Sequence, residues 1–172
     1  MGGVILVGMM GSGKTTVGRE LAARLEVPFK DTDKMLAYIL GRPEHELFRY
    51  LGEEAYRQHE TRLLRDLELD GAVLSTGGGI VTCEENWVEL RRLGTTVFLD
   101  VDGDVLKNRL RTAKKRRPLL EVPDWEDALS RLLHERKEQY EKADVHVRLQ
   151  AEEIEDVVEI VLEELKDDDR HP

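Results

Sequence analysis

Eight residues near the start of the chain, 8–15 with the sequence GMMGSGKT, constrain the fold more than any other feature. They match the pattern G-x-x-x-x-G-K-[ST], in which glycines let the backbone turn tightly and point successive N–H groups at phosphate oxygens. An apolar run at 4–7 comes directly before this loop, and an amphipathic helical pattern at 15–25 follows it. A strand, a glycine-rich loop and a helix in this order predict a site for a nucleoside triphosphate.

The residues of this loop have separate expected roles. Lys14 would bring a full positive charge to the β- and γ-phosphates, and the hydroxyl of Thr15 can ligate Mg²⁺. The helix that follows adds the partial positive charge of its N-terminus. The residues expected to bind the nucleotide phosphates are Gly11, Ser12, Gly13, Lys14, Thr15 and Thr16.

Short apolar runs alternate with longer amphipathic segments along the rest of the chain. Strands are expected at 4–7, 72–74, 96–99 and 145–147, with a weaker one at 27–29 that ends at Asp31. Helices are expected at 15–25, 53–69, 125–140 and 154–165. Strands that alternate with helices imply right-handed crossovers and a parallel sheet. The sequence therefore predicts an α/β fold, a three-layer sandwich around a five-stranded parallel sheet.

Length and charge limit the classes of function. The 172 residues suit a single domain, 1–172, and 36 acidic against 26 basic residues give a net charge of −10. This balance disfavours a general nucleic-acid or anionic-membrane binder. The single cysteine, Cys83, cannot form an internal disulfide, and no apolar run approaches the length of a membrane span. We expect a cytoplasmic monomer whose partners are small molecules.

Two acids follow the second expected strand, at Asp31 and Asp33. Carboxylates at i and i+2 of an extended segment point the same way, so both could face the crevice at the strand ends. One could hold Mg²⁺, and the other could accept the proton of an attacking hydroxyl. Asp33 could equally cap the next helix, and the pair alone does not decide between these roles.

Three consecutive glycines, Gly77, Gly78 and Gly79, come soon after another expected strand. A simple turn needs only one glycine, and three are costly to order. Bare backbone that must approach a small ligand explains them better than a plain loop does.

The segment 107–117 holds seven of the 26 basic residues and ends before Pro118. A solvated helix end and a nucleic-acid patch are both possible interpretations. Beside a triphosphate site, however, a mobile lid is more economical, because it would exclude water and bring positive charge to the transferring phosphoryl group. The basic residues are Lys107, Arg109, Arg111, Lys114, Lys115, Arg116 and Arg117.

The ordered set of motifs resembles the shikimate kinase family, within the nucleoside-monophosphate-kinase-like group of P-loop enzymes. Besides the phosphate loop, the resemblance rests on Asp31-x-Asp33, GEEAYR at 52–57 with Glu60, TGGG at 76–79, RPLL at 117–120, and Arg136 with Tyr140. It implies a P-loop kinase with a basic lid at about 111–124 and a shikimate-binding region at about 33–60. The implied reaction transfers the γ-phosphoryl group of ATP to the 3-hydroxyl of shikimate, in aromatic amino-acid biosynthesis.

The resemblance also implies roles for single residues. Lys14, Asp33 and Arg117 would be catalytic, with Asp33 also bound to ring hydroxyls, and Thr15 and Asp31 would lie at Mg²⁺. Arg57 and Arg136 would bind the shikimate carboxylate, and Gly77, Gly78 and Gly79 would line the ring. Either Arg109 or Arg111 would stack on adenine, because the spacing to Arg117 is off by one.

Some features leave other interpretations open. Arg57 and Glu60 stand at i, i+3 and could be a purely structural pair, and Arg136 could be a surface arginine with a packed stem. Tyr56 stands where the family usually has phenylalanine. The alternatives to a shikimate kinase are a kinase for another polyol acid, such as gluconate, and a catalytically silent nucleotide-binding regulator.

Overall fold

The computed structural model describes residues 2–114 and 117–168. Within them, five parallel strands form one sheet in the order β2-β3-β1-β4-β5. The strands are β1 (Gly3–Val7), β2 (Phe29–Asp31), β3 (Val73–Ser75), β4 (Gly94–Val101) and β5 (Val145–Leu149). The expected α/β fold with a five-stranded parallel sheet is thus confirmed.

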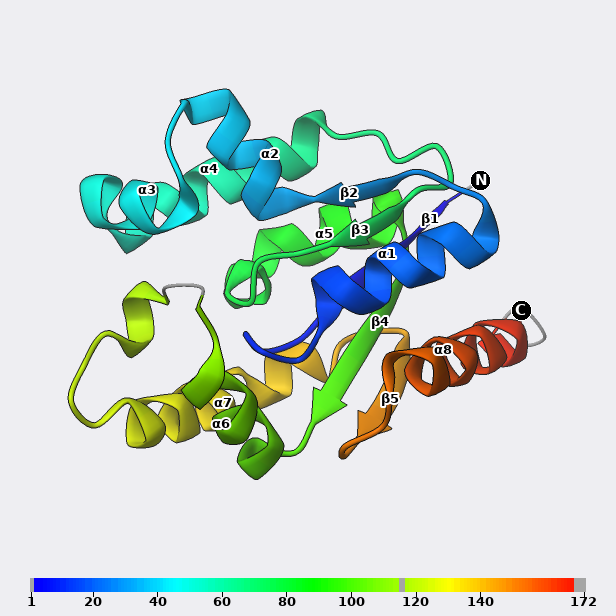
Figure 1. Cartoon of the computed structure of the whole chain (residues 1–172). Helices are drawn as coiled ribbons and strands as arrows, with labels where there is room; N and C mark the ends of the chain where they lie inside the picture. The colour runs from blue at the N-terminus through cyan, green and yellow to red at the C-terminus, as the bar shows by residue number, and fades with distance from the viewer. Residues whose placement is uncertain (1, 115–116, 169–172) are drawn as a thin grey trace.

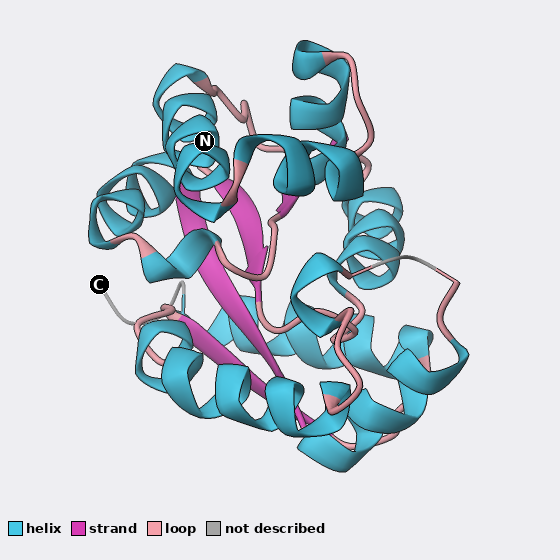
Figure 2. Ribbon diagram, turned by 90° about the vertical axis from the view of Figure 1, so that its left-hand side faces the viewer, coloured by secondary structure: helices cyan, strands magenta, loops and turns pink. Residues whose placement is uncertain are grey.

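Helices cover both faces of this sheet. Helices α1 and α8 lie on one face and α5 and α7 on the other (Figures 1 and 2), which gives the three layers expected from the sequence. The helices are α1 (Lys14–Leu25), α2 (Thr32–Leu40), α3 (Glu44–Leu51), α4 (Glu53–Asp66), α5 (Glu84–Leu93), α6 (Gly103–Thr112), α7 (Trp125–Tyr140) and α8 (Ile154–Asp168), with single 3₁₀ turns η1 (Ile80–Thr82) and η2 (Pro118–Leu120).

Burial of the strands follows their place in the sheet. In the central strand β1, Ile5, Leu6 and Val7 are completely buried, because helices cover both sides. The edge strand β5 alternates instead, with Val147 buried and His146 exposed. The continuous apolar runs therefore mark the central strands, and alternation marks the edge.

The strand register brings the functional loops to one edge of the sheet. Ser75 at the end of β3 is level with Leu6 of β1 and with Asp31 of β2. Strand β1 pairs with β3 on one side and with β4 on the other, so the chain connections diverge there. Ligands bind in open α/β sheets at the carboxyl ends of the strands beside such a switch point.

A second, smaller core supports the segment 32–66. Leu36, Leu47, Tyr56 and Leu63, from α2, α3 and α4, form an apolar cluster separate from the main core. Phe48 packs against it with its ring tilted over that of Tyr56, centroids 5.4 Å apart. This cluster lets three short helices stand beside the sheet edge as one unit (Figure 1).

The segment with the paired acids differs from the extended chain expected from its sequence. Helix α2 begins at Thr32, immediately after β2, so Asp33 lies in the first helical turn. Asp31, and not Asp33, is the N-cap, and its Oδ1 accepts a hydrogen bond from the backbone N of Lys34 at 3.2 Å. The cap satisfies a backbone N–H that would otherwise lack a partner, and this explains the early helix start.

Helix boundaries also depart from the sequence pattern. Helix α4 ends at Asp66, three residues before the expected 69. The first part of the basic segment, residues 107–112, belongs to α6. Lys115, Arg116 and the tail from 169 lie outside the described residues. Helices α2, α3, α5 and α6 are short, and their periodicity alone does not reveal them.

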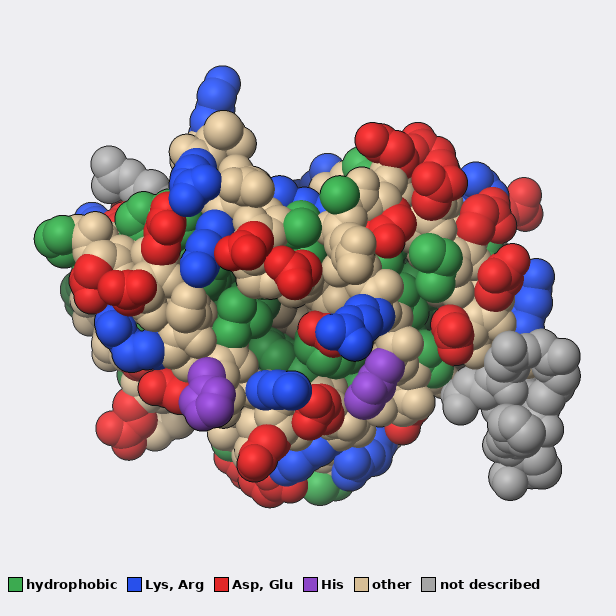
Figure 3. Space-filling model, turned by 90° about the horizontal axis from the view of Figure 1, so that it is seen from below, with side chains coloured by type: hydrophobic (Ala, Val, Ile, Leu, Met, Phe, Trp, Pro, Cys, Tyr) green, Lys and Arg blue, Asp and Glu red, His purple; other side chains and the backbone are tan. Residues whose placement is uncertain are grey.

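The surface combines both signs of charge. On the face in Figure 3, lysines and arginines are interspersed with aspartates and glutamates around an apolar hollow. Exposed pairs such as Arg65 with Glu85, 2.6 Å apart, contribute little to stability. Among the described residues, no helix has the length and apolar character needed to cross a membrane.

Reciprocal hydrogen bonds between Asp144 and Thr96 join the start of β5 to β4 and should stabilise the fold. Asp144 Oδ2 accepts from Thr96 N (2.8 Å) and Oγ1 (2.6 Å), and Asp144 N donates back to Thr96 Oγ1 (2.9 Å). Asp144→Ala leaves donors of fully buried Thr96 without an acceptor, so we expect a loss of about 2 kcal/mol in urea unfolding. Asp144→Asn keeps an acceptor and should lose less than half of that; equal losses would contradict this account.

Candidate active site

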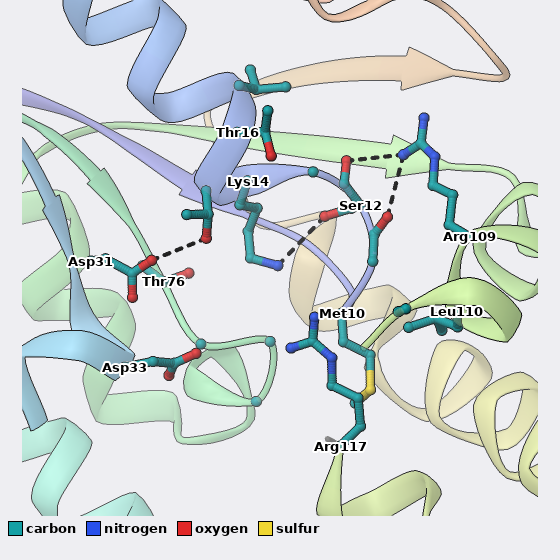
Figure 4. Close-up of a pocket in the computed structure, with 18 of the residues that line it drawn as sticks. Met10, Ser12, Lys14, Thr16, Asp31, Asp33, Thr76, Arg109, Leu110 and Arg117 are labelled. Atoms are coloured by element: carbon teal, nitrogen blue, oxygen red, sulfur yellow. Dashed lines mark hydrogen bonds between the residues drawn. The ribbon is translucent and has the colours of Figure 1, made fainter. Parts of the chain in front are cut away.

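A cavity of about 880 Å³ opens at the carboxyl edge of the sheet. Its walls come from the phosphate loop, α2, α4, the glycine turn, the end of α6, the residues around η2 and the start of α8. Every site residue expected from the sequence except Arg111 lines this cavity: Gly11, Ser12, Gly13, Lys14, Thr15, Thr16, Asp31, Asp33, Arg57, Gly77, Gly78, Gly79, Arg109, Arg117 and Arg136. Figure 4 shows the phosphate-loop side of the cavity.

The phosphate loop has the geometry of an anion cradle. Gly13 has φ +96°, a left-handed conformation that lets helix α1 begin at the next residue, Lys14. The first N–H groups of α1 therefore point into the cavity, with the positive end of the helix dipole.

The Lys14 ammonium is held across the loop. Its Nζ donates to the carbonyl oxygens of Gly8 (2.7 Å) and Met9 (3.0 Å), and the residue is 8% exposed. A buried ammonium that rests on carbonyl dipoles is poised to move a short distance to a phosphate, whose full charges attract it more strongly.

Three oxygen atoms meet beside the loop in an arrangement that fits Mg²⁺. Thr15 Oγ1 donates to Asp31 Oδ2 at 3.0 Å and lies 3.4 Å from Ser75 Oγ. Hard oxygen donors with a single carboxylate suit Mg²⁺, which keeps several waters and takes its other ligands from phosphates. The register of β2 with β3 brings Ser75 here, and its place before the glycine run in the sequence did not indicate this contact.

Across the cavity, a buried carboxylate fixes one arginine. Arg57 Nη1 donates to Glu60 Oε2 at 2.6 Å, and Glu60 is completely buried. Burial raises the pKa of Glu60, while the charges of Arg57 and Arg136 oppose that rise. The guanidinium of Arg57 also lies over the rings of Phe48 and Tyr56, 5.8 and 5.7 Å from their centroids. Its orientation is thus set from two sides.

The second arginine of this side is buried without a carboxylate of its own. Arg136 is 3% exposed, and no Asp or Glu of the described chain lies within 4.0 Å of its guanidinium. Its Nη1 contacts Met9 Sδ at 3.9 Å, a weak acceptor. A buried guanidinium that lines a cavity in this state is suited to a bound anion.

The glycine turn is bare because charged side chains pass close to it. A Cβ at Gly77 would lie 2.8 Å from both Asp33 Oδ1 and Glu60 Oε1, and one at Gly79 would lie 2.1 Å from Arg57 Nη2. The backbone N of Gly77 donates to Thr32 Oγ1 at 2.9 Å, which ties the turn to α2. The run of glycines therefore serves contacts between side chains and backbone within the protein, in addition to any ligand.

The side chains of the two arginines of α6, Arg109 and Arg111, point in different directions. Arg109 Nη1 approaches the carbonyls of Gly11 (3.3 Å) and Ser12 (3.4 Å) at the mouth of the loop, as Figure 4 shows. Arg111 points elsewhere and pairs with Glu126 at 2.8 Å, because residues two apart on a helix face different ways. The ambiguity between these arginines thus resolves in favour of Arg109 as a cavity residue.

Arg117 reaches the cavity from the far side. Its side chain lies beside Met10 and points toward the phosphate loop in Figure 4. Its Nε is buried with no hydrogen-bond partner among the described residues. This position is suited to a charge that acts on a bound phosphate.

Several lining residues lie outside the sequence motifs. Glu44 and Phe48 line the cavity from α3, and residues 151–154 line it before and at the start of α8. Tyr56 belongs to the GEEAYR motif, but the contact of its hydroxyl, which donates to Asp33 Oδ1 at 3.3 Å, did not follow from that motif. Only the helical periodicity of α3 could have indicated Glu44 and Phe48, and it does not give the packing of one helix on the next.

The close approach of Arg57 to the glycine turn predicts the effect of a single methyl group. Gly79→Ala would drive Arg57 away from Glu60 and leave a buried carboxylate without its partner, so we expect a loss on the order of 2 kcal/mol in urea unfolding. Gly103→Ala is the matched control, because its Cβ would make ordinary contact with Leu133 at 3.6 Å. Equal stability of the two variants would refute this explanation of the turn.

Comparisons with known proteins agree with this geometry. The family model described as shikimate kinase matches residues 10–166. A shikimate kinase of Synechococcus sp. (strain JA-3-3Ab) is 43% identical over 150 residues, 87% of this chain and 79% of that protein, and one of Symbiobacterium thermophilum is 40% identical over 95% of this chain and 96% of its own length. The solved structure of a shikimate kinase from Acinetobacter baumannii in complex with shikimate superposes with a TM-score of 0.91, at 33% identity, and the match covers 97% of this chain and 94% of that one. The chain therefore belongs to the shikimate kinase family.

Proposed function

We propose that the protein transfers the γ-phosphoryl group of ATP to the 3-hydroxyl of shikimate, giving shikimate 3-phosphate and ADP. One observation carries the choice of acceptor: Arg136 is buried without a carboxylate partner beside Arg57, in the same cavity as Lys14. Two guanidinium groups that line the same cavity as a phosphate cradle suit a small acceptor that bears a carboxylate. The similar shikimate kinase from Acinetobacter baumannii, solved in complex with shikimate, supports the same acceptor.

The nucleotide half of the reaction uses the phosphate loop. The N–H groups of residues 11–16 would bind the phosphate oxygens, and Lys14 would leave the carbonyls of Gly8 and Met9 for the β- and γ-phosphates. Arg109, at the mouth of the loop, would stack on adenine. Phosphoryl transfer needs positioning and charge stabilisation rather than covalent chemistry from the protein.

The acceptor half uses the opposite wall. Arg57, held by Glu60, and Arg136 would bind the carboxylate, while the glycine turn lines the ring through its backbone. Asp33 would bind the ring hydroxyls and accept the proton of the attacking hydroxyl. Its carboxylate lies directly over Gly77, on the acceptor side of the cavity.

Mg²⁺ would be held by Thr15 and Asp31, whose oxygens already meet beside the loop. When bound, the ion supplies positive charge that neutralises the phosphate oxygens. The Asp31 side chain also caps α2, so the same carboxylate fixes the helix that carries Asp33.

The lid in this proposal is the segment 111–124, and the shikimate-binding region is 33–60. Arg117 would approach the transferred phosphoryl group from the lid, as its position beside Met10 supports. An ion pair between Arg49 of α3 and Glu121 joins the lid to the shikimate-binding region. Closure would exclude water, which strengthens every electrostatic contact inside the cavity.

The proposed function also concerns the compartment and the assembly of the protein. We infer a cytoplasmic monomer in a single domain, 1–172, where Cys83 stays a free thiol. A gluconate kinase shares the need for a carboxylate contact, and a silent regulator shares the phosphate loop. Neither accounts for Asp33 beside the glycine turn together with two arginines on one wall.

Single substitutions should separate the binding of shikimate from the binding of ADP. Arg136→Ala is expected to weaken shikimate binding at least tenfold and leave ADP binding within about twofold, since it removes one charged contact to the carboxylate. Arg109→Ala should show the reverse pattern. Calorimetric titration of each variant with each ligand makes the comparison, and an equal loss of both ligands in Arg136→Ala would refute the assignment.

Acceptor identity is tested by ADP release from ATP with shikimate, quinate, gluconate, nucleoside monophosphates and water. We expect shikimate to give a kcat/KM at least about a hundredfold above every other acceptor, because a site built for specific polar contacts discriminates strongly. Preference for gluconate would identify the alternative kinase. No release with any acceptor would indicate the silent regulator.

A further inference from the structure

The hydroxyl of Tyr56 is a buried polar group at the acceptor wall that the proposed reaction has not used. Its ring belongs to the small core of α2, α3 and α4, and the residue is 2% exposed. The hydroxyl leaves that core at a single point, where it donates to Asp33 Oδ1 at 3.3 Å. A phenyl ring alone would fill the same apolar space, so the hydroxyl calls for a separate explanation.

The carboxylate that receives this hydrogen bond is closely confined. The same Asp33 Oδ1 lies 2.8 Å from where a Cβ of Gly77 would stand, so it sits directly on the glycine turn. It is thus held between the Tyr56 hydroxyl from α4 and the backbone of the turn after β3. The contact of 3.3 Å has room to shorten when an acceptor fills the cavity.

The charges around Tyr56 keep its hydroxyl protonated. Burial raises the pKa of Tyr56, and the carboxylates of Asp33 on α2, Glu60 on α4 and Glu44 on α3 raise it further, against the opposing charge of Arg57. The hydroxyl is therefore a donor at every pH at which the enzyme could work. A permanent donor stabilises the ionised form of the acid it contacts.

We propose that Tyr56 is a positioning residue, whose hydroxyl orients the Asp33 carboxylate toward the acceptor. This inference rests on the proposed function, because it takes Asp33 as the group that binds the acceptor hydroxyls. Tyr56 acts through Asp33 and does not itself touch the reacting atoms.

The decisive substitution is Tyr56→Phe, which keeps the ring in the small core and removes only the hydroxyl. We expect shikimate affinity, measured by calorimetry, to fall about tenfold, as for a hydrogen bond to a charged group, with ADP affinity unchanged. Tyr50→Phe, at a residue 75% exposed on α3, is the control and should bind both ligands as the unmodified protein does. Unchanged shikimate affinity in Tyr56→Phe, or an equal loss of ADP affinity, overturns the proposal.

A double-mutant cycle separates positioning from packing. In an Asp33→Ala background, Tyr56→Phe should cost less than about twofold in shikimate affinity, because the acceptor of its hydrogen bond is gone. The same tenfold loss in both backgrounds would mean that Tyr56 acts through the core, and would overturn the proposal. If Asp33→Ala alone binds shikimate and turns it over like the unmodified protein, the role proposed for Asp33 fails first.

Discussion

The completely buried carboxylate of Glu60 is the constraint on which the acceptor side of this molecule depends. A buried charge is costly unless it is paired, and Arg57 supplies the pair at 2.6 Å, with the charge of Arg136 close enough to act on it. Glu53 is a second carboxylate partner of Arg57, at 3.4 Å. Arg136 has no carboxylate within ion-pair distance among the described residues, and it lines the cavity, where an anionic ligand would pair with it.

Short contacts also link features that otherwise look like separate motifs. Gly77 and Gly79 are bare because Asp33, Glu60 and Arg57 come within 3 Å of where their Cβ atoms would stand. Asp31 serves α2 as its N-cap and Thr15 as its acceptor, so one carboxylate fixes both the Thr15 hydroxyl and the helix that carries Asp33. The two walls of the cavity are therefore coupled through short contacts rather than through long flexible segments.

Local chemistry made much of this site predictable. The phosphate loop identifies the nucleotide wall and the glycine run identifies part of the acceptor wall, because each is contiguous in sequence and has a backbone requirement of its own. The geometry of Asp33 was not predictable in this way, because a helix that starts at Thr32 replaces the expected extended segment. The Asp31 carboxylate accepts a hydrogen bond from Lys34 N and so favours this early helix start. Arg109 and Arg111 also required the structure, because only the packing of α6 shows which of them faces Gly11.

By itself, the sequence determined the α/β architecture, the triphosphate cradle and the resemblance to a family, since apolar runs, glycines and helix starts are local properties of the chain. Tertiary structure alone decided which charges are buried together, that Ser75 joins Thr15 and Asp31, and that the Tyr56 hydroxyl meets Asp33. These contacts depend on strand register and on helix-to-helix packing. Both are set by the whole core, and no short segment of the chain encodes them.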